Sequence, residues 1–338
     1  MKPKRKNKSV VSRTLEKKKA KIKFKKPKIT TGPNYDLKKH GVTQSILQQW
    51  LACRLACKYS LQGWRSTGLK VALEFGSLFH NLLEKQYKAI INNKKELNID
   101  YELNKWSKEI LKTYPDNQTV NDMMVKIKIL WENYFVQWKE DYKRAWVGVE
   151  TKFDVKYNGV RLRGMRDGLY RCKKTGSLWL LETKTYSDVN EQTMSDRLLF
   201  DFQNLFYITA TEEELKEDVK GVLYNIIVKP RHRLGKKETY KEFYSRLKDV
   251  IPQDLDKYFV RFEVPYGKKR KEHFKKELNN ILFYFNDWFY NNMEPTFRSS
   301  TYTCLGKIAC SFLKACAQMS MTGYERRNDL MEELGGLK

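Results

Sequence analysis

The sequence predicts an α/β protein in which a mixed sheet is flanked by helices and carries a helical N-terminal elaboration. Apolar residues recur at helical spacing through four long stretches, and runs rich in β-branched and aromatic residues lie between them. The expected helices span residues 44–61, 70–92, 120–143 and 273–291. The expected strands span residues 147–157, 162–171, 178–184, 222–228 and 259–264.

Length and composition indicate one large folded domain. The chain has 338 residues, of which 41% are hydrophobic and 13% aromatic, enough for a substantial core. We expect this domain at residues 35–320, between a basic tail at 1–34 and a C-terminal tail at 321–338. No apolar run reaches the roughly eighteen residues of a membrane span, and no signal-peptide pattern follows the basic start. We therefore expect a soluble, unsecreted, cytoplasmic protein without a membrane partner.

Positive charge is concentrated at the N-terminus. The chain has 66 Lys and Arg against 40 Asp and Glu, a net charge of +26, and residues 1–28 contain fourteen basic side chains and one acid. We expect this tail to be disordered in isolation and to bind DNA phosphates without sequence specificity. A nuclear localisation signal and an aid to solubility are the alternatives. The first basic residues of the tail are Lys2, Lys4, Arg5 and Lys6.

Residues 170–184 predict a β-hairpin that brings two carboxylates and one ammonium group together. A short turn separates two apolar runs, with Asp167 leading into the first strand and Glu182 and Lys184 on the second. Residues two apart on a strand share a face, so Glu182 and Lys184 point the same way. Thr183 then points to the other side and offers only its carbonyl group.

This set of side chains suits metal-dependent cleavage of phosphodiesters. Asp167 and Glu182 supply hard oxygen ligands for a divalent ion, which offsets the negative charge of the transition state and of the leaving oxygen. Lys184 would position or polarise the attacking water. The alternative, from these residues alone, is a surface hairpin whose polar side chains alternate with core residues.

Two helical segments add polar residues to this set. His80 and Glu84 lie one turn apart on one face of the second expected helix. A further amphipathic helix, around residues 200–210, places Gln203 and Tyr207 one turn apart. Taken singly, a histidine on a helix is usually structural, and such a Gln–Tyr pair marks the edge of a core.

In chain order, these residues form the series G-x-x-x-H, G-x-x-D, E-x-K and Q-x-x-x-Y, which resembles the RecB-like branch of the PD-(D/E)XK nucleases. That branch includes the CRISPR-associated adaptation nucleases, AddB and exonuclease V. The resemblance covers residues 45–316. The matching residues are Gly76 and His80, Asp167, Glu182 and Lys184, and Gln203 and Tyr207.

The resemblance implies a restriction-endonuclease-like core and a divalent metal cofactor. His80 as a ligand suits Mn²⁺ as well as Mg²⁺, because imidazole is a poorer partner for the harder ion. The implied metal ligands are His80, Asp167, Glu182 and Thr183. The implied catalytic residues are Asp167, Glu182, Lys184, Gln203 and Tyr207.

The cysteines predict a second metal site. In an intracellular protein, clustered cysteines indicate metal before disulfide. Cys304, Cys310 and Cys316 resemble the tail of iron–sulfur members of the branch, in which one upstream cysteine completes the set. Cys53 fits that place better than Cys57. The resemblance implies a [4Fe-4S] cluster that joins the first helix to the last segment, and zinc or inert buried thiols are the alternatives.

We therefore expect a metal-dependent deoxyribonuclease, and specifically an exonuclease on single-stranded or frayed DNA ends. Residues 222–233 look like the corresponding stretch of phage-encoded members. This favours a setting in phage or mobile-element recombination or repair, in the host cytoplasm, with a recombination or replication protein as a further partner. The competing expectation is a non-catalytic DNA-binding or integration-partner protein that keeps the fold. A sequence of that kind would lack one of the acidic metal ligands, whereas both acidic positions of the motif series are present here.

Overall fold

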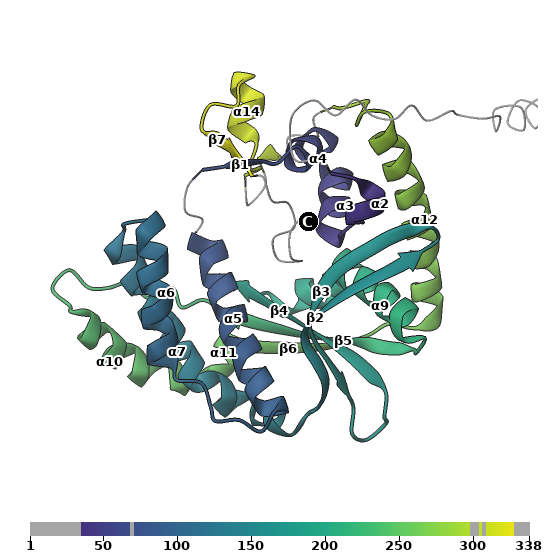
Figure 1. Ribbon diagram of the computed structural model, residues 1–338. Helices are drawn as coiled ribbons and strands as arrows, with labels where there is room; N and C mark the ends of the chain where they lie inside the picture. The colour runs from purple at the N-terminus through teal and green to yellow at the C-terminus, as the bar shows by residue number, and fades with distance from the viewer. Residues whose placement is uncertain (1–34, 68–70, 298–303, 306–308, 328–338) are drawn as a thin grey trace, which may run out of the picture.

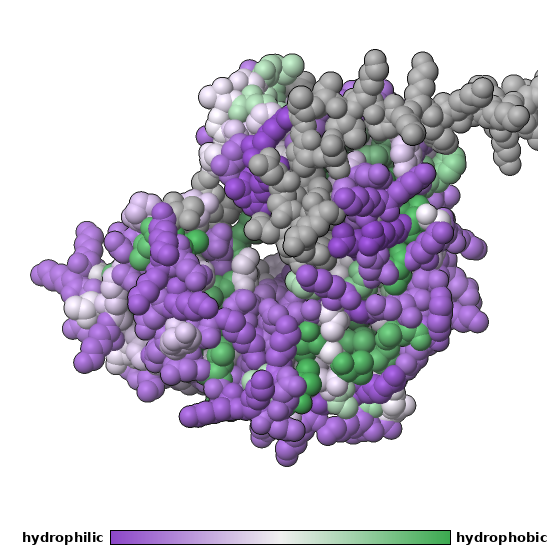
Figure 2. Space-filling view, in the orientation of Figure 1, coloured by the Kyte–Doolittle hydropathy of each residue, from purple (hydrophilic) through white to green (hydrophobic). Residues whose placement is uncertain are grey.

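The computed structural model describes residues 35–67, 71–297, 304–305 and 309–327 (Figure 1). The predicted DNA-binding residues of the tail, Lys2, Lys4, Arg5 and Lys6, lie outside these ranges. Among the described residues, no helix combines the length and the apolar character needed to cross a bilayer. Hydrophilic side chains cover most of the face seen in Figure 2.

The centre of the fold is a five-stranded mixed sheet with the strand order β2-β3-β4-β5-β6. Neighbouring strands are antiparallel except β4 and β5, which are parallel and are joined by a crossover through α8 and α9. The predicted hairpin is confirmed, because β3 and β4 pair antiparallel with Gly168 opposite Leu181. The elements are β2 (Ala145–Tyr157), β3 (Val160–Arg171), β4 (Leu178–Tyr186), α8 (Glu191–Leu198), α9 (Phe202–Leu215), β5 (Val219–Val228) and β6 (Phe259–Pro265).

The central strands are buried on both faces, so apolar residues occupy successive positions. Leu180 and Val222 pack with α3, α9 and α12 on one face. Leu181 and Leu223 pack with α5, α7 and α10 on the other. Figure 1 shows these helices on the two sides of the sheet, and the predicted α/β class is therefore confirmed. The helices are α3 (Gln44–Ala52), α5 (Val71–Ile91), α7 (Asn117–Gln137), α10 (Tyr240–Val250) and α12 (Lys268–Tyr290).

Segments near the two ends of the described chain pack together, as Figure 1 shows for α4, α14, β1 and β7. Strands β1 and β7 pair antiparallel, and Ala56 of α4 shares a small apolar cluster with Phe312 and Ala315. Strand β7 lies in the range expected as a C-terminal tail. The elements are α4 (Arg54–Leu61), β1 (Trp64–Ser66), α14 (Leu313–Gln318) and β7 (Tyr324–Arg326).

Two expected helices are interrupted. The predicted helix at 44–61 is wrong at Cys53, whose extended backbone (φ −160°, ψ 110°) ends α3 and begins α4. The predicted helix at 120–143 ends at Gln137 and is followed by a 3₁₀ turn. Apolar spacing continues through both breaks, so periodicity alone does not show them. The remaining elements are α2 (Leu37–His40), α6 (Ile99–Thr113), η1 (Lys139–Lys143), η2 (Ile251–Gln253) and α11 (Leu255–Tyr258).

Candidate metal centre and active site

Helix α5 lies close against the sheet because of a glycine. A Cβ atom on Gly76 would lie 3.2 Å from Thr185 Oγ1 of β4, closer than most real contacts. The absent side chain lets the helix approach the strand, and His80 follows one helical turn later on the same side. The spacing of the G-x-x-x-H motif thus has a packing reason.

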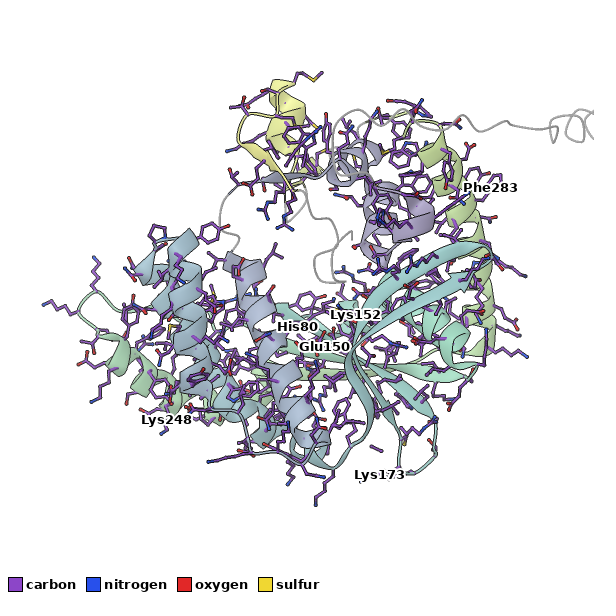
Figure 3. All side chains as sticks on the ribbon, viewed as in Figure 1. His80, Glu150, Lys152, Lys173, Lys248 and Phe283 are labelled. Atoms are coloured by element: carbon purple, nitrogen blue, oxygen red, sulfur yellow. The ribbon has the colours of Figure 1, made fainter. Side chains whose placement is uncertain are left out.

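Three potential metal ligands meet where α5 crosses β2 and β3. His80 Nδ1 lies 3.5 Å from Asp167 Oδ2 and 4.0 Å from Glu150 Oε1. One ligand atom from each residue lies within 4.8 Å of the others, and no other such group of His, Cys, Asp and Glu occurs among the described residues. Figure 3 shows His80 and Glu150 close together on their two elements. Two carboxylate oxygens and one imidazole nitrogen form a donor set that fits Mg²⁺ or Mn²⁺.

Glu150 is the ligand candidate that the sequence prediction missed. It lies on β2 between the pairs Val149–Gly168 and Thr151–Arg166, and therefore beside Asp167. Its φ of 47° is in the left-handed region, which non-glycine residues rarely adopt. Such strain is concentrated at functional sites. The sequence does show a carboxylate at position 150, within an expected strand, but none of the four motifs includes that position.

The charges of this cluster interact strongly. Burial alone would lower the pKa of His80, but the neighbouring carboxylates of Asp167 and Glu150 outweigh burial and raise this pKa to about 9. Burial and the charge of Asp167 raise the pKa of Glu150, against the opposing effect of His80. Without a metal ion, the imidazolium therefore takes the place of the cation between the two carboxylates.

The E-x-K pair lies beside this cluster with the geometry that strand alternation predicts. Lys184 Nζ lies 2.5 Å from Glu182 Oε1, and Gln203 Nε2 of α9 donates to the same oxygen at 2.7 Å. Glu182 is only 2% exposed. Burial, together with the charge of Asp167, raises its pKa to about 7 despite the nearby Lys184. Gln203 and Lys184 thus both contact the carboxylate of Glu182, the first through a hydrogen bond and the second through an ion pair.

Tyr207 lies near this series without a hydrogen bond to Glu182 in the structure. Its ring packs edge-on against Phe153, with centroids 5.5 Å apart. Burial and the charges of Glu182 and Asp167 raise the pKa of its hydroxyl, which therefore stays protonated. Arg166 fixes the helix that carries Tyr207, because its guanidinium group donates to Thr211 at 3.1 Å on α9.

Thr183 has two roles on its strand. Its backbone N–H donates to Asp167 Oδ2 at 2.6 Å and holds that carboxylate in place. Its side chain points to the other side of β4, as predicted, where Thr183 Oγ1 accepts from Asn225 Nδ2 at 3.2 Å. The candidate ligand Asp167 is therefore connected through Thr183 to the interior of the protein.

A buried polar network continues from Asn225. The Arg261 guanidinium donates to Asn225 Oδ1 at 3.0 Å and to the two Asp141 oxygens at 3.0 and 2.5 Å. Tyr87, two turns after His80 on α5, donates to Asp141 at 2.7 Å. Trp146, at the start of β2, donates to the Asp141 carbonyl at 3.0 Å. The network thus contacts α5, β2 and β4, which carry His80, Glu150 and the E-x-K pair.

The candidate ligands open into a cleft of about 790 Å³. His80, Glu150, Asp167 and Lys184 line it, and so does Lys229. The cleft is large enough to admit part of a polymer backbone. Lysine side chains and three potential metal ligands thus line one open space.

The predicted cysteine ligands lie apart from this cleft. Cys53 is buried in the cluster between α4 and the C-terminal segment, with Cys310 packed against it. The Cys310 N–H donates to the Cys304 carbonyl at 3.0 Å, and Cys316 lies on α14. Among the described residues, no three sulfur atoms lie within 4.8 Å of one another. A tetrahedral zinc site needs sulfurs about 3.8 Å apart, given Zn–S bonds of about 2.3 Å, so the present positions do not form one.

The fold combines a mixed sheet that carries two adjacent carboxylates, a helix that carries His80 and a strand that carries the E-x-K pair. This combination is typical of a metal-dependent phosphodiester hydrolase. The chain belongs to the PD-(D/E)XK nuclease superfamily, whose family model matches residues 42–317. No curated protein matches the sequence. The superfamily consists of nucleases that use Mg²⁺ or Mn²⁺, in agreement with the ligand set at the cleft.

Proposed function

We propose that this protein is a metal-dependent DNA exonuclease of the RecB-like branch that degrades single-stranded or frayed ends. The observation that carries the proposal is the cluster of His80, Glu150 and Asp167, with Lys184 beside it in an open cleft. The preference for ends rests on the resemblance of the motif series to RecB-like nucleases. The same resemblance supports a setting in phage or mobile-element recombination or repair.

His80, Glu150 and Asp167 would hold the metal ion, and Glu182 and the Thr183 carbonyl are further candidate ligands. When bound, a divalent ion supplies an activated water and offsets negative charge on the phosphate. The Thr183 N–H keeps Asp167 oriented toward the cleft.

Lys184 is the candidate for contact with the attacking water or the phosphate. Its side chain is 35% exposed and lines the cleft, while Glu182 holds its ammonium group from the buried side. Gln203 fixes Glu182 in turn. The cation is thus positioned before the substrate arrives, which avoids reorganisation during the reaction.

Incubation of the protein with end-labelled linear DNA and closed circular DNA, with and without Mn²⁺, tests the proposal. We expect metal-dependent release of label from linear DNA and no cleavage of the circle. Cleavage of both substrates would show an endonuclease. Binding without cleavage of either substrate, with Mg²⁺ or Mn²⁺, would favour the alternative of a non-catalytic DNA-binding protein.

We also propose that Cys53, Cys304, Cys310 and Cys316 hold a [4Fe-4S] cluster. The support is that the segments carrying these residues meet at one corner of the fold, around Phe312. A cluster there would join α4 to the C-terminal segment, which β1 and β7 already connect by strand pairing. Four thiolates are the usual ligand set of such a cluster.

A further inference from the structure

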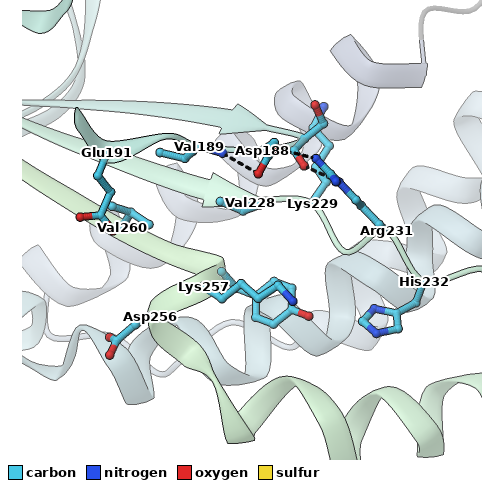
Figure 4. Close-up of a pocket in the computed structure, with 12 residues that line it drawn as sticks. Asp188, Val189, Glu191, Val228, Lys229, Arg231, His232, Asp256, Lys257 and Val260 are labelled. Carbon is cyan, nitrogen blue, oxygen red and sulfur yellow. Dashed lines mark hydrogen bonds and ion pairs between the residues drawn. The ribbon is translucent and has the colours of Figure 1, made fainter. Parts of the chain in front are cut away.

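A second pocket adjoins the catalytic cleft. It has a volume of about 450 Å³ and lies at the carboxyl ends of β4 and β5, where residues of α11 also line it (Figure 4). Ser187 and Lys229 line both the cleft and this pocket, so the two share a wall. The crevice outside the carboxyl ends of parallel strands is a preferred place for ligands in α/β sheets.

The loop after β5 is held against the loop after β4, which gives the pocket a defined shape. The Lys229 N–H donates to the Tyr186 carbonyl at 2.8 Å. The Arg231 guanidinium donates to the Ser187 carbonyl at 3.1 Å and pairs with Asp188 at 2.8 Å. Figure 4 shows Arg231 and Asp188 joined by this ion pair beside the pocket.

The lining contains three carboxylates, from Asp188, Glu191 and Asp256, and three cations, from Lys229, Arg231 and Lys257, so any excess of positive charge is local to one end, around His232. Lys257 and Arg231 are exposed at its edge, whereas Asp256 accepts a hydrogen bond from Gln137 at 2.7 Å. Burial lowers the pKa of His232, and the positive charges of Arg246, Lys257 and Lys126 lower it further. Its Nδ1 atom is buried without a hydrogen-bond partner in the structure. A phosphate oxygen at this point would be attracted by the surrounding positive charge.

The remaining wall is apolar and is formed by Val189, Val228 and Val260. The volume of the pocket is within the range of small-molecule sites and matches a nucleotide rather than a duplex. A base could contact this wall only after leaving a base-paired stack.

We propose that the second pocket binds one unpaired nucleotide of the substrate strand next to the cleaved phosphodiester, with Lys257 and Arg231 contacting its phosphate. The proposal rests on the proposed nuclease function and narrows its substrate to a strand that is single at this position. Because Ser187 and Lys229 border both spaces, a strand bound in the cleft would reach the pocket by passing these two residues.

The test measures binding of a fluorescent single-stranded oligonucleotide and of a blunt duplex of equal length, by anisotropy over a range of salt. The host protein is the full chain with Asp167→Ala, so that the DNA stays intact. The variants Lys257→Ala and Arg231→Ala are compared with Lys173→Ala, a control in the β3–β4 turn at the opposite end of β4 (Figure 3). All three positions are exposed, so the substitutions leave the core unchanged.

We expect each pocket variant to weaken single-strand binding severalfold and to reduce the salt slope by about 0.7, because one phosphate is no longer neutralised. Duplex binding and the Lys173→Ala protein should keep the host's affinity. Equal single-strand affinity in all variants, or equal losses in all three, would overturn the pocket assignment.

Cleavage by the same variants without Asp167→Ala separates this proposal from the proposed function. We expect a raised KM for single-stranded substrate with a nearly unchanged kcat. Normal KM values in an active enzyme refute the pocket alone. Inactivity of the otherwise unmodified protein refutes the nuclease function, while the anisotropy data still decide whether the pocket binds DNA.

Discussion

The ion pair between Arg261 and Asp141 lies in the interior, and its removal should be severely destabilising. The Arg261 side chain is 6% exposed and that of Asp141 is fully buried. Substitution Arg261→Met keeps most of the volume but removes five hydrogen bonds, two of them to Asp141 and one each to Asn225, Tyr134 and Glu140. Breaking a buried pair from one side costs about 3–5 kcal/mol, because the other charge stays buried.

The expected loss lies near the lower end of this range. Arg144 Nε remains 3.1 Å from Asp141, and Tyr87 still donates a hydrogen bond to the same carboxylate. The negative charge of Asp141 therefore keeps two partners in the variant. We therefore expect Arg261→Met to lower the free energy of unfolding by about 3 kcal/mol. Urea unfolding of metal-free protein, with equal m-values for variant and reference, measures this loss.

Two comparisons make the measurement decisive. Arg246→Met removes the partly exposed pair with Glu238 and should cost far less, because ion pairs in contact with solvent contribute little to stability. Asp141→Asn added to Arg261→Met should recover part of the loss, because it removes the unpaired charge. If Arg261→Met destabilises no more than Arg246→Met, the network does not support the fold as argued.

Further predictions concern the metal, the cation, the tail and the cysteines. Glu150→Gln should abolish the rise in thermal stability that Mn²⁺ gives the wild type. It should also lower the cleavage rate by about 10–100-fold or more, the loss that is typical when a residue supporting a metal ligand is removed. An unchanged thermal response to Mn²⁺ would exclude Glu150 as a ligand. Lys184→Ala should abolish cleavage while DNA affinity stays within a few-fold, and normal digestion would contradict its role. Deletion of residues 1–28 should flatten the salt dependence of duplex binding by roughly 0.9 for each phosphate that the tail neutralises, without changing metal-saturated turnover. Cys53→Ser should remove iron and lower thermal stability, whereas Cys172→Ser should do neither; colourless, iron-free wild-type protein from anaerobic purification would refute the cluster.

Local patterns in the sequence were enough to predict the β3–β4 hairpin of the candidate site. Strand alternation placed Glu182 and Lys184 on one face and turned Thr183 to the other, and the structure has this arrangement. Helical spacing likewise placed Gln203 and Tyr207 on one helix. These relations depend only on residues close in sequence, so the periods of strand and helix determine them.

Tertiary structure decided which of these elements meet. Glu150 reaches His80 and Asp167 only because β2 pairs with β3 and adopts a positive φ at that residue, which no periodic pattern encodes. The contact of Arg261 with Asp141 likewise joins elements far apart in the chain. Hydrophobic periodicity defines the buried face of each element but not its partner, because many partners bury the same apolar area equally well. The sequence alone therefore determined the chemical groups and their local order, and the packing of α5 and β2 onto the hairpin assembled them into a candidate metal centre.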